Sequence, residues 1–282
     1  IPGALVDAVV IDPSQQQGYD LFYDAALSGE VYRENIKQTS LGFSPRLVIA
    51  RRAQKELVAG SVINFGFGIP DQVAKLIALD GMAESYYQTI EHGTYGGYLL
   101  DGDLFGYALN PTCMIDGPSQ FDFYSGGGLD IAFLGFGEID QHGNVNVSKL
   151  AGNTVGPGGF IDIAQNARTV VFCGTFDTGG TSIEIGTGKL LIKANGRITK
   201  LVEEVAQITF SGPQALVHGQ RVIYVTERAV FALTRDGVAL IEIAPGVDLQ
   251  NDVLDRMGFV PRIVTEPKIM DGSLFYEDGE LP

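Results

Sequence analysis

The chain has 282 residues, a length that fits one large α/β domain or two modest ones. Its 45% hydrophobic and 19% charged residues are typical of a protein with a packed core and exclude a disordered chain. A formal net charge of −15 without a basic stripe disfavours binding to nucleic acid. Glycine is the outlier, with 37 residues in short clusters that show no repeat, which excludes a collagen-like chain.

Other features indicate the compartment. The sequence shows no signal peptide and no run of 18 apolar residues, so neither secretion nor a membrane partner is expected. Cys113 and Cys173 each lie in an apolar run, and we expect two buried free thiols in a reducing, cytoplasmic setting. The chain begins at Ile1 without an initiator methionine, and we therefore expect a processed or truncated piece of a longer protein.

Residues 1–43 differ from the rest of the chain. Residues 1–11 are an apolar run typical of extended backbone, and the turn-rich residues 12–18 follow them. Residues 19–43 carry several tyrosines and little periodicity. We expect residues 1–43 to be a linker or an arm that lies across another surface.

The main domain is expected to begin with a helix. Ser44 and Pro45 are typical of an N-cap and a first helical position, and Gly60 is typical of a C-cap. A strand, a glycine-rich turn and a second helix should follow, as at the front of a βαβ unit. These three elements are expected at residues 61–65, 66–70 and 71–79.

Short apolar runs recur along the rest of the chain, with helical stretches between several of them. This alternation predicts an α/β fold with an open, mostly parallel sheet and flanking helices. A late helix is expected at residues 248–257, ended by Gly258, and the acidic residues from Lys268 onward should form a surface tail. The predicted buried strands are residues 112–115, 129–134, 169–173, 222–225 and 238–243.

The most informative stretch runs from Thr89 to Gly97. Glu91 follows a β-type run and is at once surrounded by glycines, which allow close approach and unusual backbone angles because they lack a Cβ. Such a carboxylate can be a nucleophile, a base, a metal ligand or a solvated loop charge. Taken alone, the solvated charge is the more common case.

Three further glycine-rich segments bear on this choice. Residues 66–70 open a helix and can aim backbone N–H groups at an anion, although they lack a dinucleotide or P-loop motif. Residues 126–130 either present backbone to a ligand or start a strand. Residues 156–162 can point amides inward, as an oxyanion hole requires, or form a surface loop. From the residues alone, these alternatives stay open.

Two other kinds of site are disfavoured. His92, His142 and His218 show neither helical pairing nor a cysteine partner at zinc-site spacing, so no metal site is expected. A serine hydrolase is disfavoured because no Gly-x-Ser-x-Gly elbow follows a strand.

Taken in order, the glycine-rich motifs resemble those of class I coenzyme A (CoA) transferases. The likeness is greatest to the C-terminal, catalytic-glutamate half of the fused propionate/acetate CoA-transferases, and the β subunits of 3-oxoacid CoA-transferases look like more distant relatives. It implies a NagB/RpiA-like fold, with residues 1–43 as the linker between fused halves and residues 44–282 as the catalytic domain. The motifs lie at residues 64–70, 91–93, 127–130, 143–146 and 158–159.

The resemblance also implies a reaction. Glu91 would attack an acyl-CoA thioester, giving first an acyl-glutamyl anhydride and then a glutamyl-CoA thioester. The amide of Gly159 would stabilise the oxyanion, with short acids of the acetate or propionate type as acceptors and no metal. CoA would be a transiently covalent co-substrate. The residues implied to line its site are Asn64, Gly66, Phe67, Gly68, Ile69, Gly128, Asn146 and Gly158.

One residue departs from part of the family, since the 3-oxoacid branch has Asn where this chain has His92, and the role of His92 is left open. The N-terminal half of the fused enzymes is absent here, so we expect a partner chain or upstream segment to complete the site and the complete enzyme to be a homo-oligomer. An acyl-CoA hydrolase and a non-catalytic supporting half are the alternatives. The sequence does not name the acyl group.

Overall fold

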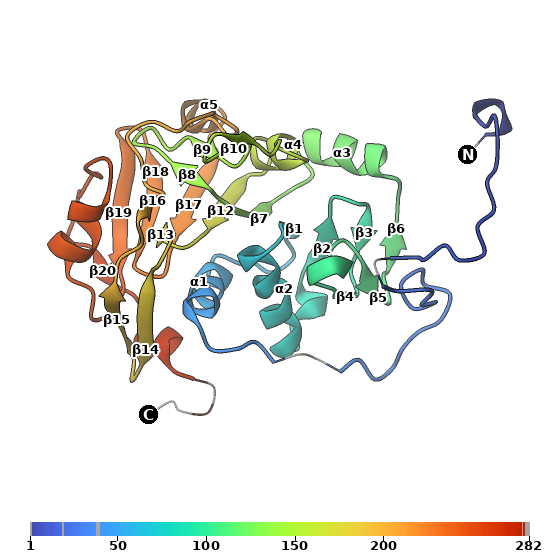
Figure 1. Cartoon of the computed structure of the whole chain (residues 1–282), viewed down its shortest axis with the longest axis horizontal. Coiled ribbons are helices and arrows are strands. Elements are labelled where there is room, and N and C mark those ends of the chain that lie inside the picture. The colour runs from blue at the N-terminus through green and yellow to red at the C-terminus, as the bar shows by residue number, and fades with distance from the viewer. Residues whose placement is uncertain (1, 19, 38–39, 278, 280–282) are drawn as a thin grey trace.

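A large twisted sheet forms the centre of the computed structural model, which describes residues 2–18, 20–37, 40–277 and 279 (Figure 1). The sheet has ten strands among these residues. In order across the sheet they are β20 (Lys268–Ile269), β19 (Gly237–Ile243), β18 (Ala229–Thr234), β17 (Arg221–Val225), β12 (Thr169–Cys173), β7 (Ile131–Gly135), β1 (Val62–Phe65), β2 (Tyr87–Ile90), β3 (Thr94–Tyr95) and β6 (Cys113–Met114).

The middle of this sheet is parallel. β17, β12, β7, β1 and β2 pair in parallel, whereas β18 and β19 on one side and β3 and β6 on the other pair antiparallel. The sheet is therefore mixed, with a parallel centre, and the predicted α/β architecture is confirmed. The central strands are continuous apolar runs because helices cover both of their faces.

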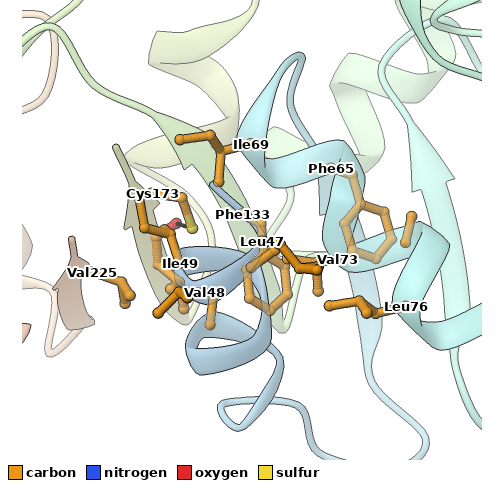
Figure 2. Close-up of a cluster of buried hydrophobic side chains, with 14 of the residues drawn as sticks. Leu47, Val48, Ile49, Phe65, Ile69, Val73, Leu76, Phe133, Cys173 and Val225 are labelled. Atoms are coloured by element: carbon orange, nitrogen blue, oxygen red, sulfur yellow. Dashed lines mark hydrogen bonds between the residues drawn. The ribbon is translucent and has the colours of Figure 1, made fainter. Parts of the chain in front are cut away.

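Helices lie on the two faces of the sheet. In the view of Figure 1, α1 (Pro45–Gln54) and α2 (Ile69–Leu79) lie below it, and α3 (Gly117–Ser125), α4 (Phe160–Ala164) and α5 (Gly212–Val217) lie above it. Side chains alternate along each strand, so neighbouring residues such as Phe133 and Leu134 enter different cores. Figure 2 shows the core under α1 and α2, where the labelled residues are Leu47, Val48, Ile49, Phe65, Ile69, Val73, Leu76, Phe133, Cys173 and Val225.

The first predicted helix ends earlier than expected. Ser44 caps α1 as predicted, because its side chain accepts a hydrogen bond from the Leu47 amide. The helix ends at Gln54 and not near Gly60, since the next amides bond to carbonyls three residues back and tighten the chain into turns. The late helix is also different in type: Leu249–Val253 is a π-helix and Leu254–Arg256 a 3₁₀ turn.

The predicted buried strand at residues 112–115 is wrong in its burial. β6 holds only Cys113 and Met114, and both are exposed because this strand is the edge of the sheet. Cys113 is therefore an exposed thiol and not a buried one. Cys173 in the central strand β12 is buried as expected, and both cysteines are free.

The C-terminal segment does not form a surface tail. β20 extends the sheet, and Met270, Leu274 and Phe275 are buried. The guanidinium of Arg51 in α1 donates to the carbonyls of Leu274 and Tyr276 at 3.3 and 2.7 Å. The prediction of a tail was wrong because the three buried apolar residues are scattered among acidic and turn residues, so they do not form an apolar run in the sequence. Residues 278 and 280–282 lie outside the described part.

Several elements were not predicted, above all α3, β18 and the hairpin of β14 (Ser182–Gly186) and β15 (Lys189–Ala194). The remaining strands form small antiparallel pairs: β4 (Tyr98–Leu99) with β5 (Ala108–Leu109), β8 (Glu138–Ile139) with β9 (Val145–Asn146), β10 (Lys149–Leu150) with β11 (Asn153–Thr154), and β13 (Asp177–Thr178) with β16 (Ile198–Thr199). Short 3₁₀ turns lie at Gly3–Leu5, Ala83–Ser85, Gly102–Leu104 and Gly272–Phe275.

The N-terminal residues form an arm that leaves the body of the molecule (Figure 1). Val9, Val10 and Ile11 are 78%, 86% and 86% exposed. Further along, the arm is attached through Asn110, whose side chain accepts from the Arg33 amide at 2.8 Å and donates to the Arg33 carbonyl at 2.9 Å. Ile1 lies outside the described residues, and a role of the arm as a linker between two halves stays a prediction. No helix in the described ranges is long and apolar enough to cross a membrane.

The two cysteines provide a test of the fold. Burial raises the pKa of the Cys173 thiol well above its ordinary value, so this thiol stays protonated and inaccessible. We expect iodoacetamide, at a pH of about 8.5 where ordinary thiols are half ionised, to modify Cys113 in the folded protein and Cys173 only after unfolding. Peptide mass spectrometry with and without urea measures both. Equal modification of the two cysteines in the native protein would contradict the fold.

Candidate active site

The carboxyl ends of the parallel strands meet at one edge of the sheet, where open α/β proteins bind their ligands. Glu91 directly follows β2, and the glycine-rich residues 66–68 directly follow β1. These two strands are neighbours in the sheet. The fold therefore brings together the carboxylate and the first glycine-rich loop that the sequence singled out.

Glu91 is half-buried and is held by a residue of the neighbouring strand. The side-chain amide of Asn64 donates from Nδ2 to Glu91 Oε2 at 3.4 Å. Asn64 pairs with Thr89 in the parallel register, and Glu91 lies two residues beyond Thr89, on the same face of the sheet. The register of β1 against β2 thus places a fully buried amide beside one oxygen of the carboxylate.

Tyr124 of α3 completes this cluster from above the sheet. Its hydroxyl lies 3.2 Å from Asn64 Nδ2 and 2.7 Å from Thr89 Oγ1. Burial raises the pKa of Tyr124 to about 12, and the charge of Glu91 contributes to this rise. The phenol is therefore neutral at physiological pH and acts as a hydrogen-bonding group.

A tight turn fixes the chain just after the carboxylate. Gly93 has a φ of +100°, and a Cβ placed there would lie 2.0 Å from the carbonyl oxygen of Ile115. The backbone of Gly93 donates to Ile90 and accepts from Ile115, both at 2.9 Å. Only glycine fits this close approach, so the direction in which Glu91 leaves β2 is determined by the backbone.

His92 packs against the neighbouring loop and is exposed. Its ring lies edge-on to Phe105 with centroids 6.3 Å apart, and Phe105 lies edge-on to Phe67 at 5.5 Å. A Cβ at Gly106 would lie 2.4 Å from His92 Nδ1, so the ring rests on that glycine. This row of rings connects the Glu91 turn with the first glycine-rich loop and gives His92 a packing role.

The first glycine-rich loop is held by hydrogen bonds from two of its backbone amides and presents an aromatic side chain. The Gly66 amide donates to the Phe133 carbonyl, and the Gly68 amide donates to Asp71 Oδ2, both at 2.8 Å. Gly68, at a φ of +96°, caps α2, and Ile69 is buried as its first residue. Phe67 is 65% exposed. The loop can thus offer a ring and backbone atoms to a ligand at the carboxyl edge.

Glycines 126–128 end a helix. The Gly127 amide bonds to the Tyr124 carbonyl and the Gly128 amide to the Phe123 carbonyl, both at 3.0 Å, which is a Schellman motif at the end of α3. A Cβ at Gly128 would lie 2.5 Å from the Phe123 ring. These glycines therefore position the helix that carries Tyr124, and a contact of Gly128 with CoA stays a prediction.

Asn146 has a structural role in its loop. Its Nδ2 donates to Glu138 Oε2 and to the Lys149 carbonyl, both at 2.7 Å. Its Oδ1 accepts from the amides of Ser148 and Lys149 at 3.0 and 3.1 Å. All four hydrogen-bonding positions of the side chain are used, so the predicted contact with CoA would need its backbone.

Gly159 lies at the start of α4, and Gly158 before it is exposed. A Cβ at Gly159 would lie 2.7 Å from the Phe121 ring, which is edge-on to Tyr124 with centroids 6.2 Å apart. Within the part of the chain that the structure describes, the Gly159 amide has no acceptor. Gly159 is thus joined to the Glu91 cluster through α3, and a direct role of its amide stays a prediction.

The buried cation at the same edge is already paired. Arg228, just after β17, is fully buried and bonds to Asp177 at 2.7 Å and to Glu227 at 3.2 Å. It also lies over the ring of Phe176 at 4.8 Å. Its charge stabilises the turn after β17, and breaking such a pair would leave a buried charge. In the described ranges no group of three or more His, Cys, Asp or Glu residues could hold a metal ion.

Thr89, Gln120 and Tyr124 were not predicted from the sequence as residues near Glu91. Asp116 followed by Pro118 is a signal for a helix start, and Gln120 and Tyr124 then share one face of that helix. Gln120 is fully buried, and its side chain lies beside the hydroxyls of Tyr95 and Tyr124. Neither Nε2 nor Oε1 of Gln120 makes a hydrogen bond of normal geometry with the described residues. What the sequence could not indicate is which strand residues this face meets.

Comparison with known proteins gives relatives of high identity. The chain is 47% identical over 278 residues to acetate CoA-transferase YdiF of Escherichia coli O157:H7, covering 98% of this chain and 52% of the relative. It is 44% identical over 285 residues to caffeate CoA-transferase of Acetobacterium woodii, and the match covers 98% of this chain and 54% of that relative. The crystal structure of a thioester complex of E. coli O157:H7 YdiF with CoA superimposes with a TM-score of 0.87 at 44% identity, covering 98% and 52%. No family model matches the chain.

The sheet, its helices and the loops at its carboxyl edge thus have the fold of CoA-transferases. With this identity over nearly its whole length, the chain belongs to the class I CoA-transferase family, as its motifs predicted. The chain spans about half the length of the curated relatives that it matches.

The turn after Glu91 can be tested by a pair of substitutions. We expect Gly93→Ala to lower the free energy of unfolding by at least about 3 kcal/mol, because it adds a backbone clash to an unfavourable φ. Gly60→Ala is the matched control, since Gly60 has a φ of +80° and no atom within 4 Å of the added Cβ. The free energy of unfolding of this control variant should fall by only about 1–2 kcal/mol. Urea unfolding measures both, and equal losses would contradict the close approach at Gly93.

Proposed function

We propose that the complete protein transfers CoA between a short-chain acyl-CoA and a carboxylic acid, with Glu91 as the nucleophile. The observation that carries the proposal is the half-buried carboxylate at the carboxyl edge, held on one oxygen by Asn64. The names of the relatives, an acetate and a caffeate CoA-transferase, support CoA transfer as the class of reaction. An acceptor of the acetate or propionate type is the finer part of the proposal.

The proposed reaction keeps the energy of the thioester in covalent bonds. Glu91 attacks the acyl carbonyl, and the C–S bond breaks to give an acyl-glutamyl anhydride and CoA thiolate. The thiolate attacks the glutamyl carbonyl and releases the first acid, which leaves a glutamyl-CoA thioester. The acceptor carboxylate then attacks this thioester, and the returning thiolate attacks the new acyl group, so that a new acyl-CoA and free Glu91 are formed.

Other residues would support these steps. Each tetrahedral intermediate carries an oxyanion, and the Gly159 amide, which has no acceptor in the described structure, is our candidate donor. The exposed ring of Phe67 and the adjacent backbone of Gly66 and Gly68 are the candidate surface for CoA. Water must be kept from the anhydride, and this is a task for surfaces that cover the edge.

A second half is part of the proposal. The chain spans about half the length of its relatives, and Glu91 is only half-buried in this chain. We propose that a preceding segment or partner chain covers the carboxyl edge and contributes to the acid site. Assembly into a homo-oligomer and a cytoplasmic location stay predictions.

Trapping of the thioester tests the nucleophile. The complete protein is incubated with acetyl-CoA and then with borohydride, which reduces a glutamyl thioester to a primary alcohol. We expect peptide mass spectrometry to find this change at Glu91 in the wild type and not in Glu91→Gln, which should also lose CoA transfer.

Two activity measurements separate the alternatives. CoA release without an acceptor acid, at the rate of the full reaction, would indicate an acyl-CoA hydrolase. Transfer activity that survives Glu91→Ala would indicate a supporting half and sink the assignment of Glu91.

A further inference from the structure

We infer that Tyr124 is a positioning residue for Glu91: its phenol fixes the Asn64 amide so that one N–H of that amide holds Oε2 of Glu91 and leaves Oε1 free to attack. The inference rests on the proposed function, because it assigns a task within the Glu91 reaction. Nothing in the sequence pattern alone connects Tyr124 with Glu91. The connection comes from a chain of hydrogen bonds between β1, β2 and α3.

The direction of this chain can be worked out from its fixed end. Thr89 Oγ1 lies 2.8 Å from the carbonyl oxygen of Ile63, which only accepts. The single hydroxyl proton of Thr89 is therefore used there, and Thr89 Oγ1 must accept the proton of Tyr124 at 2.7 Å. The hydroxyl of Tyr124 then has only lone pairs to offer to its other two neighbours, the side chains of Asn64 and Gln120.

The lone pairs of the Tyr124 hydroxyl bear on how the side-chain amide of Asn64 is oriented. Nδ2 can face Tyr124 at 3.2 Å, whereas Oδ1 in its place would meet lone pairs without a proton between them. The second N–H of the same group points to Glu91 Oε2 at 3.4 Å. One chain of hydrogen bonds, which we call the relay, thus joins Ile63, Thr89, Tyr124 and Asn64. Its donors and acceptors have a fixed order, and Glu91 lies at its end.

Burial makes the relay effective. Asn64, Thr89 and Tyr124 are all 0% exposed, so water does not compete for their hydrogen bonds. Asn64 Oδ1 has no partner among the described residues, which means that the hydrogen bonds of Nδ2 decide the orientation of the amide. Loss of the phenol oxygen would remove the closer of the two acceptors that keep the amide from turning over, and leave only the 3.4 Å contact with Glu91 Oε2.

The relay has a consequence for the reaction. In the anhydride and in the glutamyl-CoA thioester, Oε2 is the carbonyl oxygen of the glutamyl group if Oε1 made the bond. The N–H of Asn64 then lies on the oxygen that becomes an oxyanion when thiolate or acceptor attacks. Tyr124 therefore acts on rate through Asn64, and acyl-CoA binding should depend on it little.

The test uses the complete protein and the rate of borohydride-trapped labelling at Glu91. We expect Tyr124→Phe to slow labelling by about 10- to 100-fold, which is no more than the slowing caused by removal of one oxyanion donor. The KM for acetyl-CoA should change by less than about 2-fold. Thr89→Val should slow it similarly, because Tyr124 would then turn its proton toward Asn64. Thr89→Ser keeps the acceptor and should restore most of the rate.

Tyr224→Phe is the matched control. Tyr224 is also fully buried, and its hydroxyl donates to the Gly143 carbonyl at 2.7 Å, outside the relay. We expect it to lower stability without slowing labelling. Labelling of Tyr124→Phe at the wild-type rate, or equal slowing in Tyr224→Phe, would overturn the inference alone. Absence of labelling in the wild type would overturn the proposed function, and the inference with it.

Discussion

The parallel register of β1 against β2 is the constraint on which the site depends. It sets Asn64 opposite Thr89 and therefore beside Glu91 two residues further on. A shift by one residue would turn Asn64 to the face covered by α2, because side chains alternate across a strand. The register itself is fixed by the apolar residues on either side of Asn64, since Ile63 and Phe65 must enter the core beneath α1 and α2. A polar contact of 3.4 Å is thus positioned by hydrophobic packing.

The second constraint comes from the two ends of α3. Asp116 caps the helix at its start, where its side chain accepts from the Ser119 amide at 3.0 Å, and the glycines at its end close a Schellman motif. Between these caps, Tyr124 reaches down to the strands and Phe121 closes on Gly159. One short helix therefore relates the carboxylate of Glu91 to the glycine-rich segment before α4. The helix matters here as a spacer between two loops.

The sequence predicted the parts of this structure that local patterns determine. The apolar runs of β1, β7, β12, β17 and β19 and the strand-turn-helix at residues 61–79 were predicted correctly in kind. Glu91 was singled out because the glycines around it allow close approach to its carboxylate, and the loop after β1 because its glycines open a helix whose N–H groups can face an anion. The prediction that Cys113 is buried was wrong because an apolar run does not indicate whether a strand lies at the centre or the edge of a sheet. The relay of Thr89, Tyr124 and Asn64 was missed because it joins residues from three elements.

The exposed arm determines how the isolated chain behaves in concentrated solution. Val9, Val10 and Ile11 present β-branched side chains to solvent, and such segments associate with the edges of other sheets. A net charge of −15 opposes this by repulsion between molecules. Repulsion of this kind is screened over about 8 Å at physiological salt, whereas the contact between apolar segments is not. We therefore expect the colloidal stability of the isolated chain to decrease as salt is added.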